Sequence, residues 1–502
     1  MRSNSKEGMA LALMSKLRAN TKVLFLVLGI ILVLVTVAGS FAAISSGNKA
    51  PSKYVAEVNG IKLEREEFER NFFFEWQNQN QMNYGQLTGM DQEPMKTQYL
   101  VNMLLNEALL DEAKKLKLDA TKEEVAEELK KVEESVGGAD ELQARLEMVG
   151  VSIDTLNRDI KNSLIFQKLA EHLTKDITIA DDDVRTQLEE VKASHILVED
   201  EETAKDLYAQ LQNGADFAKL AKENSTDPGS KDEGGELGFF TRGSMVAEFE
   251  TAAFALKPGE ISEPVKSQFG WHIIKVEDKK SPTDAEFEEK KATASEELLN
   301  KKKTERLIAY QNEVKGKAKI KIFDPQLKAR YELNEGKIEE AIKSYNEAIK
   351  SKPSDPYLYA SLSEAYHRKG DLDKAWENIL EASAKSNDAA IKMNLAMLGQ
   401  VKMQNIVNAK ETEEEKSSQE WANEDENIKA IYDDVIKALD EAAATNEGDL
   451  WSHLQIAQMY NSFGEKEKGQ AEMDKVKALA EKLQQQSGEE QDNETTEEQP
   501  AE

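Results

Sequence analysis

Two histidines and an aspartate stand where they could form one polar site. The chain has five histidines, and two of them, His195 and His272, each lie in a short apolar, β-branched run that predicts a strand. Between the two runs, a polar loop at 224–233 contains Asp227, and a glycine-rich segment follows it. This arrangement indicates a built site rather than chance scatter.

Three interpretations of these residues stay open at this point. Histidines on neighbouring strands are often a structural pair satisfied by hydroxyl groups. They can also line a pocket that acts on a substrate, and both roles can hold together. A metal ion held by His195, His272 and Asp227 is disfavoured because no further ligands flank them, so we expect neither a metal nor a cofactor. We expect surface or packing roles for the other histidines, which are His172, His367 and His453.

The stretch that must position these side chains runs from 192 to 280 and carries five short motifs in order. They are S-H-I-L at 194–197, L-A-K-E-N-S-T-D at 220–227, G-G-E-L-G-F-F at 234–240, A-F-A-L-K-P-G-E-I-S-E-P-V at 253–265 and G-W-H-I-I at 270–274. Together they resemble the parvulin family of peptidyl-prolyl cis/trans isomerases. The resemblance implies an α+β domain with a small antiparallel sheet and surrounding helices.

The resemblance also implies roles for named residues. His195 and His272 match the family's paired imidazoles, and Asp227 matches a polar position of the loop. That loop, from Asp227 to Gly234, is one residue longer than the commonest form. Ser267 matches the hydroxyl position ahead of the second histidine. The catalytic set implied is therefore His195, Asp227, His272 and Ser267, and the residues implied to bind the substrate's proline are Leu237, Met245 and Phe249.

Catalysis of this isomerisation requires neither a nucleophile nor a metal ion. Rotation about an X-Pro bond has a barrier near 20 kcal/mol and takes roughly tens of seconds without help. The barrier comes from amide resonance, so a catalyst needs an apolar socket for the ring and surroundings that favour the twisted amide. The segment after the first strand reads E-D-E-E-T at 199–203. Its negative charge would repel a phosphoserine, so we predict no phosphate specificity.

The N-terminus predicts a membrane anchor. Residues 1–22 are basic, and 23–44 are uncharged and mostly apolar. Twenty-two residues span roughly 33 Å as a helix, enough to cross a bilayer, and the basic flank should stay in the cytoplasm. A cleaved signal peptide is the alternative, because A-G-S-F-A-A at 38–43 offers small residues. Residues 45–53 form a polar linker. We expect one membrane span and an extracytoplasmic bulk, by analogy on a bacterial, Gram-positive cell surface.

Residues 54–191 are predicted to form a hairpin around Asn59-Gly60 and then several helices. We expect helices from Glu64 to Gln81 and from 94 to 116, and a capping-box start at Thr121. This order resembles the N-terminal domain of SurA-like and foldase chaperones, in which the segment 283–323 returns to complete the domain. A plain helical spacer is the alternative, but the aromatic and methionine side chains exceed what a spacer needs.

Residues 324–484 carry a repeat. Gly336 and Gly370 lie 34 residues apart, which is the tetratricopeptide period, and Ala341 and Ala375 occupy the small position between paired helices. Gly464 marks a later unit, and an acidic insertion near 409–426 splits a degenerate one. This resembles an α-solenoid whose concave face binds a protein partner. The acidic tail, 485–502, is predicted to be disordered.

Composition narrows the function further. The net charge is −30 with 32% charged residues, which argues against a nucleic-acid partner. The sequence has no cysteine, which excludes disulfides and thiolate metal sites. We therefore expect a multidomain, membrane-anchored, extracytoplasmic peptidyl-prolyl isomerase and chaperone that acts on unfolded or exported polypeptides containing X-Pro bonds. A non-catalytic holdase and a repeat-based assembly scaffold at the membrane are the alternatives.

Overall fold

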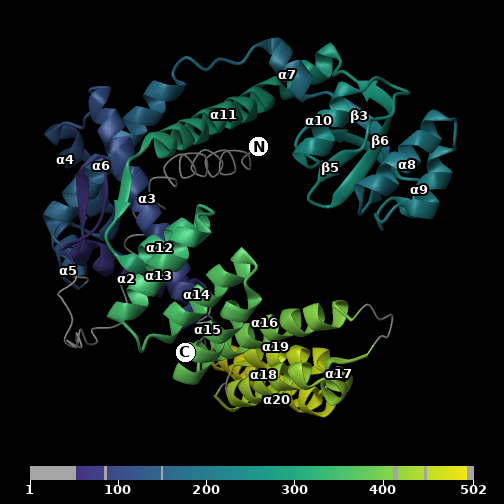
Figure 1. Ribbon diagram of the computed structural model, residues 1–502. Coiled ribbons are helices and arrows are strands. Elements are labelled where there is room, and N and C mark those ends of the chain that lie inside the picture. The colour runs from purple at the N-terminus through teal and green to yellow at the C-terminus, as the bar shows by residue number, and fades with distance from the viewer. Residues whose placement is uncertain (1–51, 84–86, 149–150, 411–415, 446–448, 495–502) are drawn as a thin grey trace, which may run out of the picture. The chain divides into compact units, whose positions relative to one another are not determined.

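A computed structural model describes residues 52–83, 87–148, 151–410, 416–445 and 449–494 (Figure 1). The chain forms two compact units, one made by 165–313 and the other by the residues before 165 and after 313. The predicted basic segment 1–22 and membrane span 23–44 lie outside the described residues. Among the helices that are described, none combines the length and apolar character needed to cross a bilayer.

The sheet of the larger unit joins two distant parts of the chain. β1 (Tyr54–Val58) and β2 (Ile61–Glu64) form the predicted hairpin. Asn59 and Gly60 take φ values of 51° and 90°, which a tight turn of this kind requires at both central positions. β7 (Ile320–Ile322) lies antiparallel to β1 on its other edge, with Ala56 opposite Ile322. The strand predicted near 318–324 is therefore present, and it pairs with residues about 260 positions earlier.

Helices follow the hairpin in the predicted order. Their bounds are α2 (Arg65–Met82), α3 (Gly89–Lys115), α4 (Lys122–Val136), α5 (Ala139–Met148) and α6 (Ile153–Thr174). The capping box of α4 is confirmed, because the Glu124 N–H donates to Thr121 Oγ1 and the Thr121 N–H donates to the Glu124 carboxylate. The expected start of α3 at 94 was wrong. The helix begins at Gly89, since the Thr88 N–H donates to Asp91 and caps an extra turn before Pro94.

The smaller unit has a four-stranded antiparallel sheet in the order β4-β3-β6-β5. The strands are β3 (Glu190–Val198), β4 (Glu236–Thr241), β5 (Val265–Ser267) and β6 (Gly270–Lys280). The helices are α7 (Asp181–Gln187), α8 (Glu201–Gln212), α9 (Phe217–Asn224), a 3-10 turn (Lys231–Glu233), α10 (Ala247–Ala255) and α11 (Asp284–Lys317), whose last turns pass into the larger unit. This is the α+β arrangement that the sequence predicts.

The sheet of the smaller unit is covered on both faces. On one face, Ile196, Val198 and Ile273 pack against residues of α8 and α9. On the other face, Ala193 and Ile274 pack against Phe249 of α10 and its neighbours. This division follows from the period-two alternation of side chains along each strand. His195 follows Ala193 by two positions, so its side chain lies on the same face of the sheet, the face that α10 covers.

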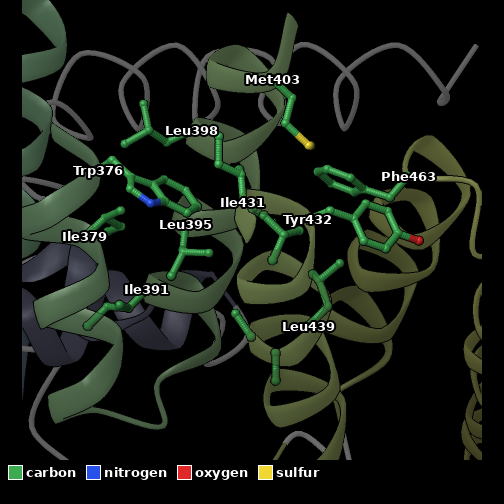
Figure 2. Close-up of a cluster of buried hydrophobic side chains, with 14 of the residues drawn as sticks. Trp376, Ile379, Ile391, Leu395, Leu398, Met403, Ile431, Tyr432, Leu439 and Phe463 are labelled. Carbon is green, nitrogen blue, oxygen red and sulfur yellow. The ribbon is translucent and has the colours of Figure 1, made fainter. Parts of the chain in front are cut away.

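The C-terminal part of the larger unit is a series of paired helices. Their bounds are α12 (Pro325–Asn334), α13 (Ile338–Ser351), α14 (Pro356–Lys369), α15 (Leu372–Lys385), α16 (Ala389–Asn408), α17 (Ser418–Glu424), α18 (Glu426–Thr445), α19 (Leu450–Ser462) and α20 (Lys466–Glu494). Ala341 and Ala375 are fully buried, as predicted for the small positions. Figure 2 shows one apolar cluster of these helices, to which Trp376, Leu395 and Phe463 contribute from different helix pairs.

The acidic insertion and the C-terminal tail both contain helix. The acidic insertion is partly built into the fold, because α17 lies within it and buries Trp421 in the repeat core. The tail 485–502 was expected to be disordered; α20 continues to Glu494, and residues 495–502 lie outside the described residues. Glutamine and glutamate are favourable helix residues, and extending an existing helix is far easier than starting one.

Candidate active site

The central strands bring the two predicted histidines together. His195 of β3 lies opposite Ile274 of β6, and Leu197 lies opposite His272. His195 and His272 are therefore diagonal neighbours on one face of the sheet, close enough for their side chains to meet. Their rings are nearly parallel, with centroids 5.5 Å apart. Both imidazoles are buried.

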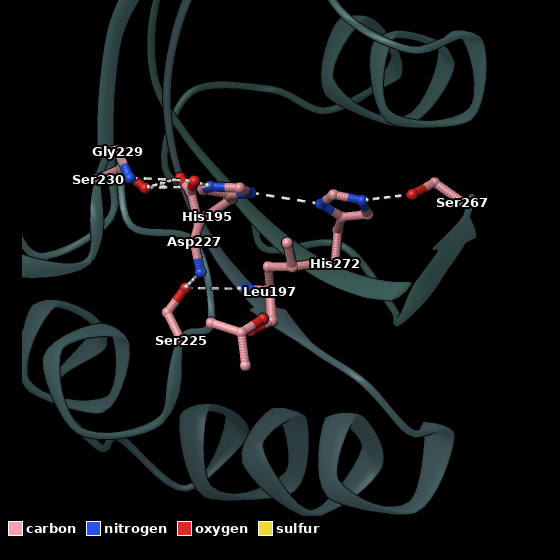
Figure 3. A network of polar contacts seen from close by, with 9 residues as sticks. His195, Leu197, Ser225, Asp227, Gly229, Ser230, Ser267 and His272 are labelled. Carbon is pink, nitrogen blue, oxygen red and sulfur yellow. Dashed lines mark hydrogen bonds and ion pairs between the residues drawn. The ribbon is translucent and has the colours of Figure 1, made fainter. Parts of the chain in front are cut away.

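A chain of polar contacts runs through both rings (Figure 3). His195 Nδ1 lies 3.3 Å from His272 Nδ1. At one end, His195 Nε2 lies 2.8 Å from an oxygen of Asp227 and 3.1 Å from Ser230 Oγ. At the other end, His272 Nε2 lies 2.7 Å from Ser267 Oγ. Four residues predicted from the sequence thus form one connected network.

The protonation of Asp227 sets the direction of every bond in this network. Burial by itself raises the pKa of Asp227, but hydrogen bonds from Ser230, His195 and Gly229 outweigh it and lower the pKa to about 2. An ionised carboxylate only accepts, so His195 Nε2 donates to it. His195 Nδ1 then accepts from His272 Nδ1–H, and His272 Nε2 accepts from the Ser267 hydroxyl. The network is satisfied with both imidazoles neutral.

The electrostatics of His272 agree with this assignment. Burial is the largest cause that lowers the pKa of His272 to about 4, and a proton on the neighbouring His195 ring would act in the same direction. A neutral His272 carries one proton, which it needs on Nδ1 to donate to His195. The site is thus a fixed set of hydrogen bonds near neutral pH.

Hydrogen bonds join the loop after α9 to β3, and they hold Asp227 beside His195. The Ser225 hydroxyl accepts from the backbone N–H groups of Leu197 and Asp227. The Thr226 N–H donates to the Leu197 carbonyl at 2.8 Å. Ser230 Oγ donates to Asp227 at 2.5 Å. Ser225 and Ser230 were not predicted as site residues. The spacing Asp227-Pro-Gly-Ser230 is a turn signal that could have revealed Ser230.

Gly235 allows the other edge of the site to form. Its φ is +86°, and a Cβ atom there would lie 2.2 Å from the His195 carbonyl oxygen. The His195 N–H donates to the Gly235 carbonyl at 2.8 Å. Only glycine satisfies both the left-handed backbone and this close approach.

The three predicted apolar residues lie in one cluster beside the imidazoles. Phe249 is buried, and its ring meets the rings of His195 and His272 edge-on, at centroid distances of 5.6 and 5.3 Å. Leu237 and Met245 are partly buried and pack against the same cluster. Partial exposure of an aliphatic and a thioether side chain next to a buried ring leaves apolar surface for a small ring to contact.

No group of three or more side chains suited to a metal ion occurs among the described residues. Each ring nitrogen of His195 and His272 has a hydrogen-bond partner in the protein.

Comparison with protein families agrees with this geometry. Residues 181–280 match the model of the PPIC-type PPIase domain, residues 13–170 match the SurA-like N-terminal domain, and residues 332–370 match a TPR repeat. A curated relative, foldase protein PrsA of Caldanaerobacter subterraneus subsp. tengcongensis, is 34% identical over 319 residues, which cover 60% of this chain and 98% of the relative. The chain belongs to the PrsA foldase family.

Other PrsA proteins show the same relationship. PrsA 3 of Bacillus anthracis is 36% identical over 47% of this chain and 81% of its own length. The crystal structure of the peptidylprolyl isomerase PrsA from Bacillus cereus is 33% identical, covers 55% of this chain and 95% of its own, and has a TM-score of 0.30. As a PrsA foldase with a parvulin domain, the protein is a peptidyl-prolyl cis/trans isomerase that assists protein folding. These matches cover between 47% and 60% of this chain.

Proposed function

We propose that isomerisation takes place beside the histidine pair. In this proposal, His195, Asp227, His272 and Ser267 form the catalytic network, and Leu237, Met245 and Phe249 hold the substrate's proline ring. The observation that carries the proposal is the contact of the Phe249 ring with both imidazoles of a fully connected network. In this contact the centroid of the Phe249 ring lies 5.6 and 5.3 Å from the centroids of the His195 and His272 rings.

The proposed mechanism requires no covalent step. Apolar side chains would take the proline ring and remove water from the preceding carbonyl, which favours the twisted amide because that form has less charge separation. The neutral imidazoles would fix the shape and polarity of the wall without transferring a proton. Asp227 would hold His195 in the required tautomer, and Ser267 would do the same for His272.

An isomerisation assay on a proline peptide tests these assignments. Asp227→Ala is expected to lower kcat/KM about tenfold or more, since it leaves a buried donor unpaired. Met245→Ala is expected to raise KM about tenfold through lost apolar contact. Asp232→Ala, an exposed carboxylate of the same loop, is the matched control and should keep wild-type kinetics. A wild-type rate equal to background would leave only the non-catalytic holdase.

We also propose a division of labour along the chain. Residues 54–191, completed by 283–323, would form the chaperone domain that holds unfolded polypeptide. Residues 192–280 would act on its prolines, and 324–484 would form the repeat domain. The pairing of β7 with β1 supports the return of the chain to the first domain.

We place the protein at a bacterial membrane, with residues 23–44 as an uncleaved anchor and the remaining chain on the extracytoplasmic side. The apolar run and its basic flank support this, and exported polypeptides would be the substrates. Sequencing the mature N-terminus from a membrane fraction is the test. A mature chain that begins within 40–50 would replace the anchor with a cleaved signal peptide.

A further inference from the structure

The first turns of α3 meet the repeat helices within the larger unit. Helix α3 contacts both α12 and α16, and Met90 packs against the apolar core of the repeats. Ser361 of α14 donates a hydrogen bond to Glu93 of α3. The helices α12, α14 and α16 each open one of three successive helix pairs. They therefore lie on the same side of the stack, and α3 crosses that side (Figure 1).

A buried ion pair lies at the centre of this contact. An oxygen of Glu93 is 3.6 Å from Arg330 Nη2 of α12, and the two side chains are 4% and 6% exposed. Arg330 also donates to Glu364 at 2.7 Å and to Ser361 at 3.2 Å. Burial raises the pKa of Glu93, and the charge of Arg330 opposes that shift. A buried charge is tolerated only with such partners. The contact therefore requires an acidic side chain at position 93 opposite Arg330.

The backbone of α3 fits the repeats as closely as its side chains do. A Cβ atom at Gly89 would lie 2.0 Å from the hydroxyl of Tyr357. Because Gly89 has no side chain, the first turn of α3 can pack directly against the ring of Tyr357. Thr97, two turns further on, is also fully buried. Because Gly89, Glu93 and Thr97 are spaced four residues apart, they lie on one face of α3, and this face defines the contact segment Gly89–Thr97.

The same contact holds polar atoms that have no hydrogen-bond partner among the described residues. These atoms are Glu93 Oε1, Thr97 Oγ1, Arg330 Nε and Tyr345 Oη. Burying such groups unpaired weakens an interface. The repeats are therefore held to α3 by a specific contact that is weaker than an apolar core of the same area.

We propose that the repeat docking face, formed by Arg330, Tyr357, Ser361 and Glu364, binds residues 89–97 of the same chain. The repeats then serve as a brace on the chaperone domain instead of standing free to recruit another protein. An outside partner that used this face would have to displace α3 first. This proposal does not depend on isomerase activity.

Hydrogen exchange on the full chain tests the docking. Glu93→Lys places a cation against Arg330, and Gly89→Leu drives a side chain into Tyr357. Each variant is expected to speed exchange about tenfold or more, both in the first turns of α3 and in α12 and α14. Both substitutions lie outside the repeats, so repeat folding, checked by circular dichroism, should persist. Unchanged exchange in α12 and α14 would overturn the proposal.

A matched pair of arginines makes the test specific. Arg330 and Arg368 both donate to Glu364, but only Arg330 also reaches Glu93. Arg330→Met should release α3, whereas Arg368→Met should leave its exchange unchanged. Equal effects of the two substitutions would contradict the proposal. If Arg330→Met unfolds the repeats, the two α3 variants still decide.

The absence of native cysteine allows a direct check that the contact lies within one chain. A Gly89→Cys/Tyr357→Cys variant, treated with a short bis-maleimide, should give a monomer with an internal cross-link. Adding Glu93→Lys should reduce the yield about tenfold. A cross-link between two chains, or none, would refute docking within the chain.

Discussion

Ser230 shows how one unpredicted hydroxyl controls the candidate site. It donates to Asp227 and also lies within reach of His195 Nε2. Hydrogen bonds from Ser230, His195 and Gly229 keep Asp227 ionised despite its partial burial. The tautomer of His195, and through it that of His272, therefore depends on a residue that makes no predicted contact with substrate.

Ser230→Ala is expected to lower kcat/KM about three- to tenfold, because the lost bond is worth about 1 kcal/mol and its loss lets His195 reorient. The pKa of Asp227 should rise, which a carboxylate NMR titration would detect. Ser281→Ala, an exposed serine of the same unit, is the control. If the Asp227 titration did not move, Ser230 would have no role in setting the tautomers.

His272 predicts a pH dependence of stability. Its pKa in the folded chain is lowered to about 4, mainly by burial, while an unfolded histidine titrates near 6.5. Between these values the unfolded chain binds more protons, so this contribution to stability is complete above about pH 6.5 and is lost as the pH falls toward 4. Asp227, with a pKa of about 2, adds a further loss only below about pH 4.

The check is urea unfolding of the full chain at pH 7, 5.5 and 4.5, followed by hydrogen exchange of the β3 and β6 amides. The wild type should lose stability steadily over this series. His272→Gln should have a lower stability at pH 7 and a shallower decline, because it removes the group responsible. Parallel pH profiles for the two proteins would exclude His272 as the source.

At the scale of elements, close approach of backbones decides where the site forms. His195 of β3 donates its N–H to the carbonyl of Gly235, directly before β4. Ser225 and Thr226 hydrogen-bond the polar loop to β3. The glycine motif G-G-E-L-G is informative in the sequence. Its physical reason, the 2.2 Å approach of an added Cβ to the His195 carbonyl, becomes visible only with β3 in place.

Gly235→Ala is expected to destabilise β3 much more than Gly243→Ala. Both glycines have φ near +90°, but a Cβ atom at Gly243 would meet nothing within 4 Å. Gly243→Ala should therefore cost only the left-handed penalty, about 1 kcal/mol, and Gly235→Ala should add the cost of moving β3. Hydrogen exchange of the β3 amides in both variants measures the difference, and equal costs would disprove the steric explanation.

At the scale of the whole molecule, distant segments complete the sheet and the repeat contact. β1 pairs with β7 across about 260 residues, and α3 reaches Arg330 across a similar separation. Folding of the N-terminal part therefore has to wait for residues that follow the isomerase segment. Such long-range pairing is slow because loop closure precedes any gain from contacts.

Ile322→Asn tests this dependence. Ile322 is buried in β7, while Lys321 beside it is exposed. The buried substitution should destabilise the β1–β2–β7 sheet by about 3 kcal/mol and expose β1 amides to exchange. Lys321→Asn should change stability by less than about 0.5 kcal/mol. Unaltered β1 protection in Ile322→Asn would show that the first sheet forms without its last strand.

Much of this arrangement could be predicted because its signals are local. The Asn59-Gly60 turn, the capping box at Thr121 and the period between Gly336 and Gly370 each report the backbone conformation of their own residues. The helix start at Gly89 and the continuation of α20 were missed. In the first case the helix boundary was expected at Pro94, although the capping residue Thr88 lies six residues earlier. In the second case a polar composition was taken for disorder.

The sequence by itself determined the types of elements, the family resemblance and the residues that meet at the histidine pair. The resemblance of 192–280 to the parvulin family named those residues position by position, because its motifs stand in order along the chain. Only the tertiary structure decided that Ser230 holds Asp227, that the two imidazoles contact each other, and that α3 lies on the repeats. Each of these depends on a contact between separate elements, and a contact of that kind leaves no period or spacing in the chain.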